Sequence, residues 1–371
     1  MSFQPPADRD RAGRQGPSIN RRGAVLGMAA VAGIAAFDVG GFLYGGGWAR
    51  PSALTPSRFV DRFEQVYGHH DGFRRNHAKG LSATGTFASN GAGVAVCKAA
   101  LFTTGTVPVV GGFSLCGGIP EQADKSDTVR GLALLFLLPN GEQWRTAMVN
   151  LPVFLDNTPE GFYERLLASK PLPDSGRPDP QKMAAFLSRH PETVAAMNIV
   201  KQNPPSPGFD DSTFHGLNAF RFTNSAGATV PVRWTAVPEQ HGVAPVPHRL
   251  NDPNSLFDTL IRVVARQPVR WRLIVTIGQP DDPTNDATKL WPSSRPSIDV
   301  GTISVDSVET EAAGNGRDVN FDPLVLPNGI APSDDPLLGA RSAVYAQSFT
   351  RRAGEHKQPS VVNVAQVPDE R

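Results

Sequence analysis

The sequence predicts an α+β fold whose antiparallel strands close into a barrel with helices around it. Strand-like apolar runs follow one another through short turn sequences, and helix-like segments are grouped between the strand sets. That order is typical of antiparallel α+β proteins, and closing the sheet would remove its exposed edges. Gly (36) and Pro (34) are abundant, which favours many turns over a helical bundle. A chain of 371 residues is long enough to bury a sizeable core.

Helices are expected in four parts of the chain. In residues 57–68 apolar side chains recur at helical spacing, and Ser57 is placed to cap the N-terminus. Residues 157–200 contain two helical stretches, each with a capping residue and a proline near its start. Residues 255–267 predict another helix, and a final helix is expected over about 336–353.

Short apolar stretches cut by Gly, Pro and Asn begin at about residue 80 and indicate strands. Asn140-Gly141 lies between two of these runs, and this dipeptide is a strong hairpin signal. A second turn is expected at Ser225-Ala226-Gly227. The predicted strands lie at 105–115, 130–138, 143–154, 218–224, 228–237, 269–278 and 298–309.

The N-terminal part combines basic residues with an apolar run. Arg21-Arg22 resembles a twin-arginine export signal, and the fifteen uncharged residues 23–37 suit a signal core better than a full membrane span. Gly47-Trp48-Ala49 offers a cleavage site; uncut, residues 23–47 would tether the protein to the membrane. A buried helix is the alternative, although the run has no polar face.

Three parts of the chain follow from these patterns. Residues 1–49 are expected to be an export signal or membrane anchor, residues 50–355 the folded domain, and residues 356–371 a disordered polar tail. We therefore expect a cell-envelope protein. It would be periplasmic, or anchored to the inner membrane with its folded domain outside the cytoplasm.

Charge and cysteine content limit the possible partners. The formal net charge is +1, and basic and acidic residues are interspersed, so no nucleic-acid partner is expected. Cys97 and Cys116 are compatible with one disulfide or with two isolated thiols, and they lack metal-type spacing. His69-His70-Asp71 contains metal-ligating residue types, but adjacent residues rarely point at one ion.

The final helix carries two residues that can take part in chemistry together. Arg341 and Tyr345 are four residues apart and so share one helical face. A guanidinium one turn from a phenol would favour the phenolate, and tyrosinate is one of the axial ligands that proteins use for haem iron. Such a pair is usually structural, and it gains meaning only with a matching residue set elsewhere.

That set begins with RNHAKG and the following LSATGTF, which resemble the distal segment of haem catalases, where V-H-A-K-G-A-G-A-F-G recurs. Further segments resemble catalase motifs in the same order over about residues 57–353. They are GFSLCGGIPEQADKSDTVRGLALLF, MVNLPVF, NAFRFTNSAGATVPVRW, DATKLWPSSRPSIDVGTISV and FDPLVLPNGIAPSDDPLLGARSAVY. The chain resembles most the small catalase-related peroxidases, because the long arm and extensions of full-length catalases are missing. This resemblance implies a catalase-like closed β-barrel that binds ferric haem b.

The resemblance also assigns roles. His77 falls on the distal acid-base histidine and Ser114 on the serine that orients its imidazole. Tyr345 falls on the axial tyrosinate and Arg341 on the arginine that keeps it ionised. Two propionate-binding arginines and a haem-pocket phenylalanine are implied at Arg74, Arg352 and Phe154.

Three departures from the family pattern affect the expected chemistry. The third propionate arginine is replaced by Gly112, which predicts weaker or rearranged anchoring. Asn76 replaces the valine before the distal histidine. An ungapped register places Val149 on the asparagine that binds peroxide and Asn150 on its neighbour, so Asn150 or Asn76 is the candidate substitute.

Together these features favour a haem peroxidase over an efficient catalase. The expected activity reduces hydrogen peroxide or organic hydroperoxides with a small organic reductant. The alternatives are a small true catalase, a hydroperoxide rearranger like the allene oxide synthases, and a non-enzymatic haem-holding or empty shell. A monomer or dimer is expected.

Overall fold

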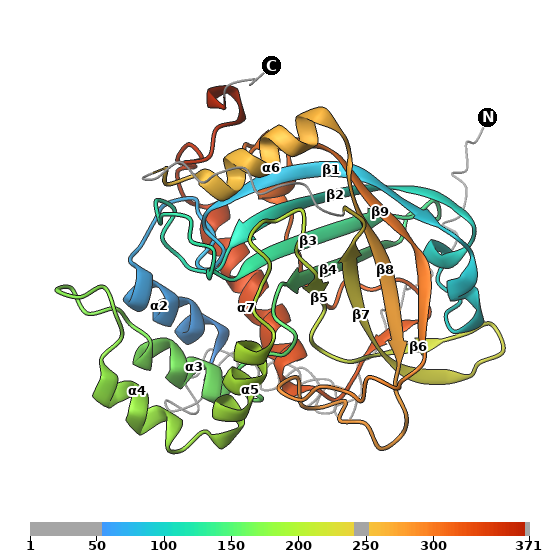
Figure 1. Ribbon diagram of the computed structural model, residues 1–371, viewed down its shortest axis with the longest axis horizontal. Coiled ribbons are helices and arrows are strands. Elements are labelled where there is room, and N and C mark those ends of the chain that lie inside the picture. Colours follow the sequence, from blue (N-terminus) through green and yellow to red (C-terminus); the bar gives the residue numbers. More distant parts are fainter. Residues whose placement is uncertain (1–53, 241–251, 368–371) are drawn as a thin grey trace, which may run out of the picture. The chain divides into compact units, whose positions relative to one another are not determined.

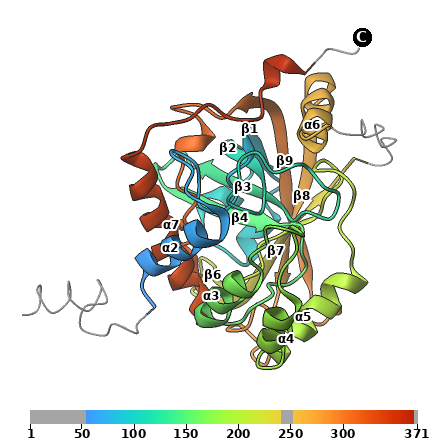
Figure 2. The same ribbon diagram turned by 90° about the vertical axis from the view of Figure 1, so that its left-hand side faces the viewer.

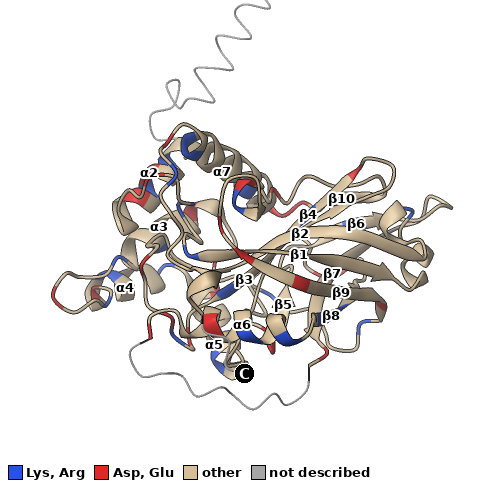
Figure 3. Cartoon of the chain, turned by 90° about the horizontal axis from the view of Figure 1, so that it is seen from above, with Lys and Arg blue, Asp and Glu red and all other residues tan. Residues whose placement is uncertain are grey.

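The computed structural model describes residues 54–240 and 252–367, and the fold concerns the unit that begins at Pro56. The export or anchor segment predicted within residues 1–49 lies outside the described residues. Among the helices that are described, none combines the length and apolarity needed to cross a membrane. Lys/Arg and Asp/Glu residues are interspersed along the helices and strands (Figure 3).

Within the described ranges, eight antiparallel strands close into a barrel in the order β7-β5-β4-β3-β2-β1-β9-β8, and β8 pairs back with β7 (Figure 1). The closed antiparallel barrel predicted from the sequence is therefore confirmed. Strands β6 and β10 extend the sheet beyond β7. The strands are β1 (Gly80–Ser89), β2 (Gly105–Leu115), β3 (Arg130–Leu137), β4 (Gln143–Val149), β5 (Phe214–His215), β6 (Phe220–Thr223), β7 (Thr229–Pro238), β8 (Val269–Ile277), β9 (Ser297–Thr310) and β10 (Ile330–Pro332).

Both predicted turns are present. β3 and β4 are joined through Asn140-Gly141, and Gly141 has a φ of 82°, which a residue without a Cβ adopts at low cost. Gly227, with a φ of 84°, lies in the turn between β6 and β7. The sequence did not delineate β1, because its alternating Ala, Thr, Gly and Ser residues give no continuous apolar run.

The helices pack outside the barrel. α2 contacts both α3 and α7, and α6 packs against β9 (Figures 1 and 2). Their bounds are α2 (Pro56–Tyr67), α3 (Pro159–Ala168), α4 (Pro180–Leu187), α5 (Pro191–Gln202), α6 (Ser255–Arg266) and α7 (Pro336–Ala353).

Helix ends follow the predicted chemistry in α3 and differ from it in α2. The Gly161 amide donates to Thr158 Oγ1 at 3.1 Å, and Pro159 occupies the first turn of α3. Ser57 was predicted to cap α2, but the helix already begins at Pro56. The Ser57 hydroxyl instead accepts a hydrogen bond from Arg351 Nη2 of α7 at 2.8 Å. The cap prediction is wrong because local sequence does not show this partner 294 residues away.

The barrel interior is filled by large apolar side chains. Burial alternates along β4, where Trp144 and Met148 are buried and Ala147 and Val149 are half-buried. Trp144, Trp234 and Trp271 are fully or almost fully buried. The interior is therefore a packed core, and the opposite face of the sheet is available for a site.

The segment after α7 is ordered through Val367, contrary to the disorder predicted for it. Val362 is fully buried in the main core, and the Val364 amide donates to Thr310 Oγ1 at 3.0 Å. Although the segment is polar in composition, Val362 lies in the main core and Val364 and Val367 pack against it. Cys97 and Cys116 are both unpaired, so the disulfide alternative is not realised.

Candidate functional site

A cavity of about 330 Å³ is lined by residues of β2, β3 and β4 and by helices α2, α3 and α7. It gathers residues from segments that are far apart in the sequence. The predicted site residues that line it are Arg74, Asn76, His77, Ser114, Phe154, Arg341, Tyr345 and Arg352.

His77 lies in the segment before β1 and has a φ of 59°, which is unusual for a residue with a side chain. Two contacts of its surroundings hold this conformation. Arg74 Nε donates to the His77 carbonyl at 2.8 Å, and the Ala78 amide donates to the Gly117 carbonyl at 3.0 Å. A strained backbone that neighbouring contacts maintain is frequent at functional sites.

Residues of two neighbouring strands, β2 and β3, position the His77 imidazole. His77 Nδ1 lies 3.0 Å from Ser114 Oγ of β2, and Ser114 is paired across the sheet with Gly131 of β3. A Cβ on Gly131 would lie 3.0 Å from the Ser114 hydroxyl and 3.2 Å from the imidazole Nδ1. Gly131 is therefore required for this close approach, and its role was not recognised from the sequence.

The protonation state of His77 follows from its surroundings. Burial lowers the pKa of His77 to about 4, and the positive charges of Arg74 and Arg341 act in the same direction. The imidazole is therefore neutral at neutral pH. With Nδ1 engaged by Ser114, Nε2 is the nitrogen left to accept a proton from a molecule in the cavity.

Tyr345 and Arg341 lie together on α7, as the helical spacing predicted. The Arg341 guanidinium carbon is 6.0 Å from the centre of the Tyr345 ring. Arg341 also donates to the Asn218 side-chain oxygen and, at 3.3 Å, to the Ala147 carbonyl. These two bonds fix the guanidinium beside the phenol.

Asn218 extends this arrangement to the start of α7. Its Nδ2 donates to Asp335 Oδ2 at 2.8 Å, and Asp335 Oδ1 accepts the Leu337 amide at 2.9 Å as the helix cap. Asn218 is fully buried. The sequence predicted only a helix over about 336–353, and both its cap at Asp335 and the link to Asn218 come from the structure.

A cluster of arginines lies where Arg74 and Arg352 line the cavity. Arg74 is paired with the buried carboxylate of Glu311, and Arg352 Nη1 donates to the Arg317 carbonyl at 2.6 Å. Burial, together with the neighbouring charge of Arg74, lowers the pKa of Arg352 to about 10. Buried like charges favour an anionic ligand at this end of the cavity. Nothing in the sequence predicted that Glu311 and Arg317 would lie near this end of the cavity.

Small residues form a row in the cavity wall. Gly112 pairs with Ala133, and Ala133 pairs with Ala147, across three neighbouring strands. A Cβ on Gly112 would lie 2.8 Å from the Leu81 carbonyl oxygen, so the backbone leaves no room for a side chain at this position. The row leaves space for a flat group against the sheet. The sequence analysis predicted that glycine in place of arginine at position 112 weakens or rearranges propionate binding, and this stays a prediction.

Asn76 and Asn150 were the candidates for the polar residue beside the imidazole. Asn76 lines the cavity, and its Oδ1 accepts the Gly117 amide at 2.9 Å. Asn150 is buried outside the cavity lining, and its Oδ1 accepts the Arg130 amide at 2.8 Å. Val149 lines the cavity instead. Asn150 is therefore the one predicted site residue that the structure does not bring to the cavity.

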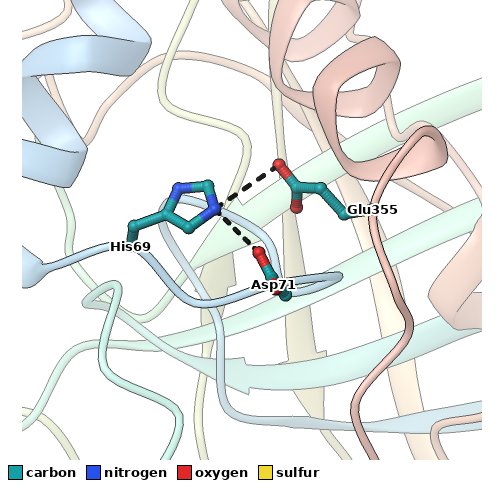
Figure 4. Close-up of side chains that lie close together, drawn as sticks. All are labelled: His69, Asp71 and Glu355. Carbon is teal, nitrogen blue, oxygen red and sulfur yellow. Dashed lines mark hydrogen bonds and ion pairs between the residues drawn. The ribbon is translucent and has the colours of Figure 1, made fainter.

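His69 and Asp71 do come together with Glu355, as Figure 4 shows. His69 Nε2 lies 2.8 Å from Asp71 Oδ1 and 3.9 Å from Glu355 Oε1. Glu355 is already bonded by both terminal nitrogens of the buried Arg75, whose Nε donates to Glu64 at 2.7 Å. These charges are satisfied by one another, so the group serves as an ion-pair network that ties the segment before His77 to α2 and to the end of α7.

The donor set fits a haem group. The Tyr345 phenol offers an oxygen ligand beside the Arg341 guanidinium. Arg74 and Arg352 offer the positive charge that two carboxylates require. The row of small residues leaves room for a macrocycle, and His77 supplies a neutral base in the same cavity.

Comparison with known proteins agrees with this arrangement. The sequence model of the family described as Catalase matches residues 53–370. The chain is 37% identical over 303 residues to a "Catalase-related peroxidase" of Synechococcus elongatus, covering 81% of this chain and 89% of that protein. It is 33% identical over 304 residues to a protein of the same name from Mycolicibacterium paratuberculosis, covering 81% and 96%.

Solved structures show the same fold. A bacterial catalase superposes with a TM-score of 0.66 at 22% identity, covering 86% of this chain and 63% of that chain. Catalase A from Saccharomyces cerevisiae gives a TM-score of 0.65 at 19% identity, covering 95% and 69%.

Proposed function

Because this chain belongs to the catalase family, we propose that it is a haem-dependent peroxidase that reduces hydrogen peroxide or organic hydroperoxides with a small electron donor. The observation that carries the proposal is the presence of the His77–Ser114 pair and the Arg341–Tyr345 pair in one cavity. The first pair handles protons, and the second offers an anionic ligand for iron.

The haem would be held by residues of α7 and of two loop segments. Tyr345 of α7 would ligate the iron, and Arg341 would stabilise negative charge on its phenolic oxygen. Arg74 and Arg352 would bind the propionates, and Phe154 would contact the macrocycle. Bound haem supplies the redox chemistry that cleaves the O–O bond.

The chain's own residues move the proton. His77 Nε2 accepts it from one peroxide oxygen and returns it to the departing oxygen, while Ser114 keeps Nδ1 engaged. The overall balance is ROOH + 2 AH → ROH + H₂O + 2 A•, where AH is the donor. Val149 in the cavity wall, in place of an asparagine, supports a low rate of dismutation of two peroxides to oxygen.

The test is an absorption spectrum of the purified protein and of Tyr345→Phe, followed by peroxide turnover. We expect a Soret band of ferric tyrosinate haem that is shifted or lost in the variant, and turnover that requires an added organic donor. Rapid oxygen release from hydrogen peroxide alone would point to a true catalase. Consumption of an organic hydroperoxide without a donor would point to a rearranger. A protein that takes up no hemin would refute both enzymatic functions.

For the N-terminal segment we propose export, with residues 1–49 acting as a cleaved signal or as a membrane anchor. The arginine pair and the uncharged run support this, and the family match begins only at residue 53. Cell fractionation with antibody detection tests it, since recovery in the cytoplasm with an uncut N-terminus would contradict export. We propose a monomer or dimer, which light scattering of the purified chain distinguishes from larger assemblies.

A further inference from the structure

The cavity wall contains several arginines, and two of them, Arg75 and Arg165, have no part in the proposed chemistry. Among the described lining residues there are five arginines and a single carboxylate, Glu311. Arg74, Arg352 and Arg341 serve the proposed haem site, and Arg75 is held between two glutamates. Arg165 of α3 remains to be explained.

Arg165 is fixed by a carboxylate behind the wall. Its Nε donates to Asp156 at 2.9 and 2.8 Å, and its Nη2 lies 2.8 Å from Asp156 Oδ2. The Asp156 side chain is 1% exposed and lies outside the cavity lining. The Nη1 of Arg165 has no hydrogen-bond partner within residues 54–240 and 252–367. The guanidinium is thus held rigidly with one donor nitrogen unassigned.

The surroundings of Arg165 within the cavity are aromatic. Its guanidinium carbon lies 5.2 Å from the centre of the Phe162 ring. The Phe162 ring in turn lies 5.8 Å from Phe154, 6.0 Å from Phe63 and 6.1 Å from Phe59. All four phenylalanines, which we call the aromatic cluster, line the cavity. One cation among apolar rings suits a molecule with an apolar body and one negative charge.

This part of the cavity is close to the imidazole side of the site. Cys116 and Arg165 both line this cavity. The Cys116 thiol lies 3.6 Å from Asn76 Oδ1, and Asn76 immediately precedes His77. A molecule bound at Arg165 would therefore extend toward the residues that handle peroxide.

We propose that Arg165 and the aromatic cluster form a subsite for the carboxylate of an apolar organic substrate. The inference rests on the proposed peroxidase function and specifies its substrate class. The carboxylate belongs either to the hydroperoxide or to the electron donor, because both must reach the same cavity. The other role for Arg165 would be only to anchor α3 to Asp156.

Pairs of probes that differ only in charge separate these possibilities. One arm compares linoleic acid hydroperoxide with its methyl ester, using a neutral donor. The other compares 4-hydroxyphenylacetate with its methyl ester as donor, using hydrogen peroxide. Each arm is run on the wild-type holoenzyme, on Arg165→Gln, and on Arg189→Gln, whose side chain is 61% exposed and pairs with Glu164 outside the cavity.

In one arm or both, Arg165→Gln should raise the acid-to-ester ratio of KM by about tenfold, the value of one charge-assisted hydrogen bond. The arm that responds identifies the acidic substrate. Arg189→Gln should leave the ratio unchanged. An equal loss of activity toward acids and esters, accompanied by a lower Tm, would assign Arg165 to anchoring α3 and overturn the proposal. An unchanged ratio in both arms would overturn it as well.

A binding measurement keeps this test independent of turnover. Calorimetric titration with phenylacetate and with methyl phenylacetate should show preferential binding of the acid by wild type and loss of that preference in Arg165→Gln. If peroxidase turnover fails while this preference persists, the subsite stands and the proposed activity is wrong. If turnover succeeds without the preference, the activity stands and the subsite is wrong.

Discussion

At the scale of single residues, the imidazole of His77 depends on three neighbours that act in different ways. The Arg74 side chain holds its carbonyl, the Ser114 hydroxyl engages Nδ1, and the absence of a side chain at Gly131 leaves room for both. The position of the base is therefore set by packing as much as by hydrogen bonding.

Gly131→Ala should lower kcat/KM for peroxide by about one hundredfold, because a displacement of the base by about 1 Å has an effect of that order. The added Cβ would press against Ser114 Oγ and the imidazole. Gly339→Ala is the matched control, since Gly339 is exposed on α7 and an added Cβ meets nothing within 4 Å. Steady-state kinetics measure the effect, and equal activity of the two variants would show that the close approach has no role.

The pH profile of peroxide reduction should report the lowered pKa of His77. The neutral imidazole is the active form, so kcat/KM should stay level as the pH falls from about 8 and should drop to half near the His77 pKa of about 4. A midpoint near about 6.5 would indicate an ordinary exposed histidine.

His215 provides the control, because burial also lowers its pKa to about 4 and it does not line the cavity. His215→Gln should leave the midpoint unchanged. Circular dichroism at each pH separates loss of activity from unfolding. Both histidines take up protons more readily in the unfolded chain, so their contribution to stability is lost as the pH falls from about 6.5 toward 4.

At the scale of elements, α7 combines most of the proposed cofactor contacts. Arg341, Tyr345 and Arg352 line the cavity from this one helix, at spacings of four and seven residues that keep them on one face. The cap at Asp335 therefore positions the helix and, through Asn218, the guanidinium of Arg341.

Asp335→Ala should lower the free energy of unfolding by about 1 kcal/mol through loss of the helix cap. It should also shift the Soret band, because Asn218 loses a partner and no longer fixes Arg341. Asp335→Asn retains a capping oxygen and should be the milder variant. Denaturant titration and absorption spectra measure the two effects, and a stability loss without any spectral change would limit Asp335 to capping.

At the scale of the whole molecule, the segment after α7 belongs to the folded unit. Glu355 neutralises the buried Arg75, and Val362 is buried in the main core. Arg75 lies two residues before His77, so the segment after α7 supports the segment that carries the His77 imidazole.

A chain that ends at Gly354 should lose about 3 kcal/mol of unfolding free energy, because a buried arginine loses one partner and a buried valine is removed. Gln358→Ala, at an exposed position of the same segment, should be neutral. Urea unfolding measures both. A shortened chain as stable as the full chain would contradict this prediction and show that the segment after α7 adds nothing to stability.

The sequence by itself determined the features that depend on near neighbours or on ordered motifs. Asn140-Gly141 specified a hairpin, the periodicity of residues 336–353 specified a helix, and the spacing of Arg341 and Tyr345 placed them on one face. The ordered motifs around His77 and Tyr345 predicted the closed barrel that the structure contains.

Tertiary structure decided which side chains meet in the cavity. Gly131, Asn218, Glu311 and Arg165 reach the site from segments whose local sequence gives no sign of it, because their partners depend on strand register and helix packing. Asn150 is the opposite case, a predicted site residue that does not reach the cavity. Val149 lines the cavity, whereas the Asn150 side chain accepts a hydrogen bond from the Arg130 amide outside it. Local propensities act over a few residues, whereas the site also depends on contacts such as Arg341–Asn218 and Arg74–Glu311, which join residues more than a hundred positions apart.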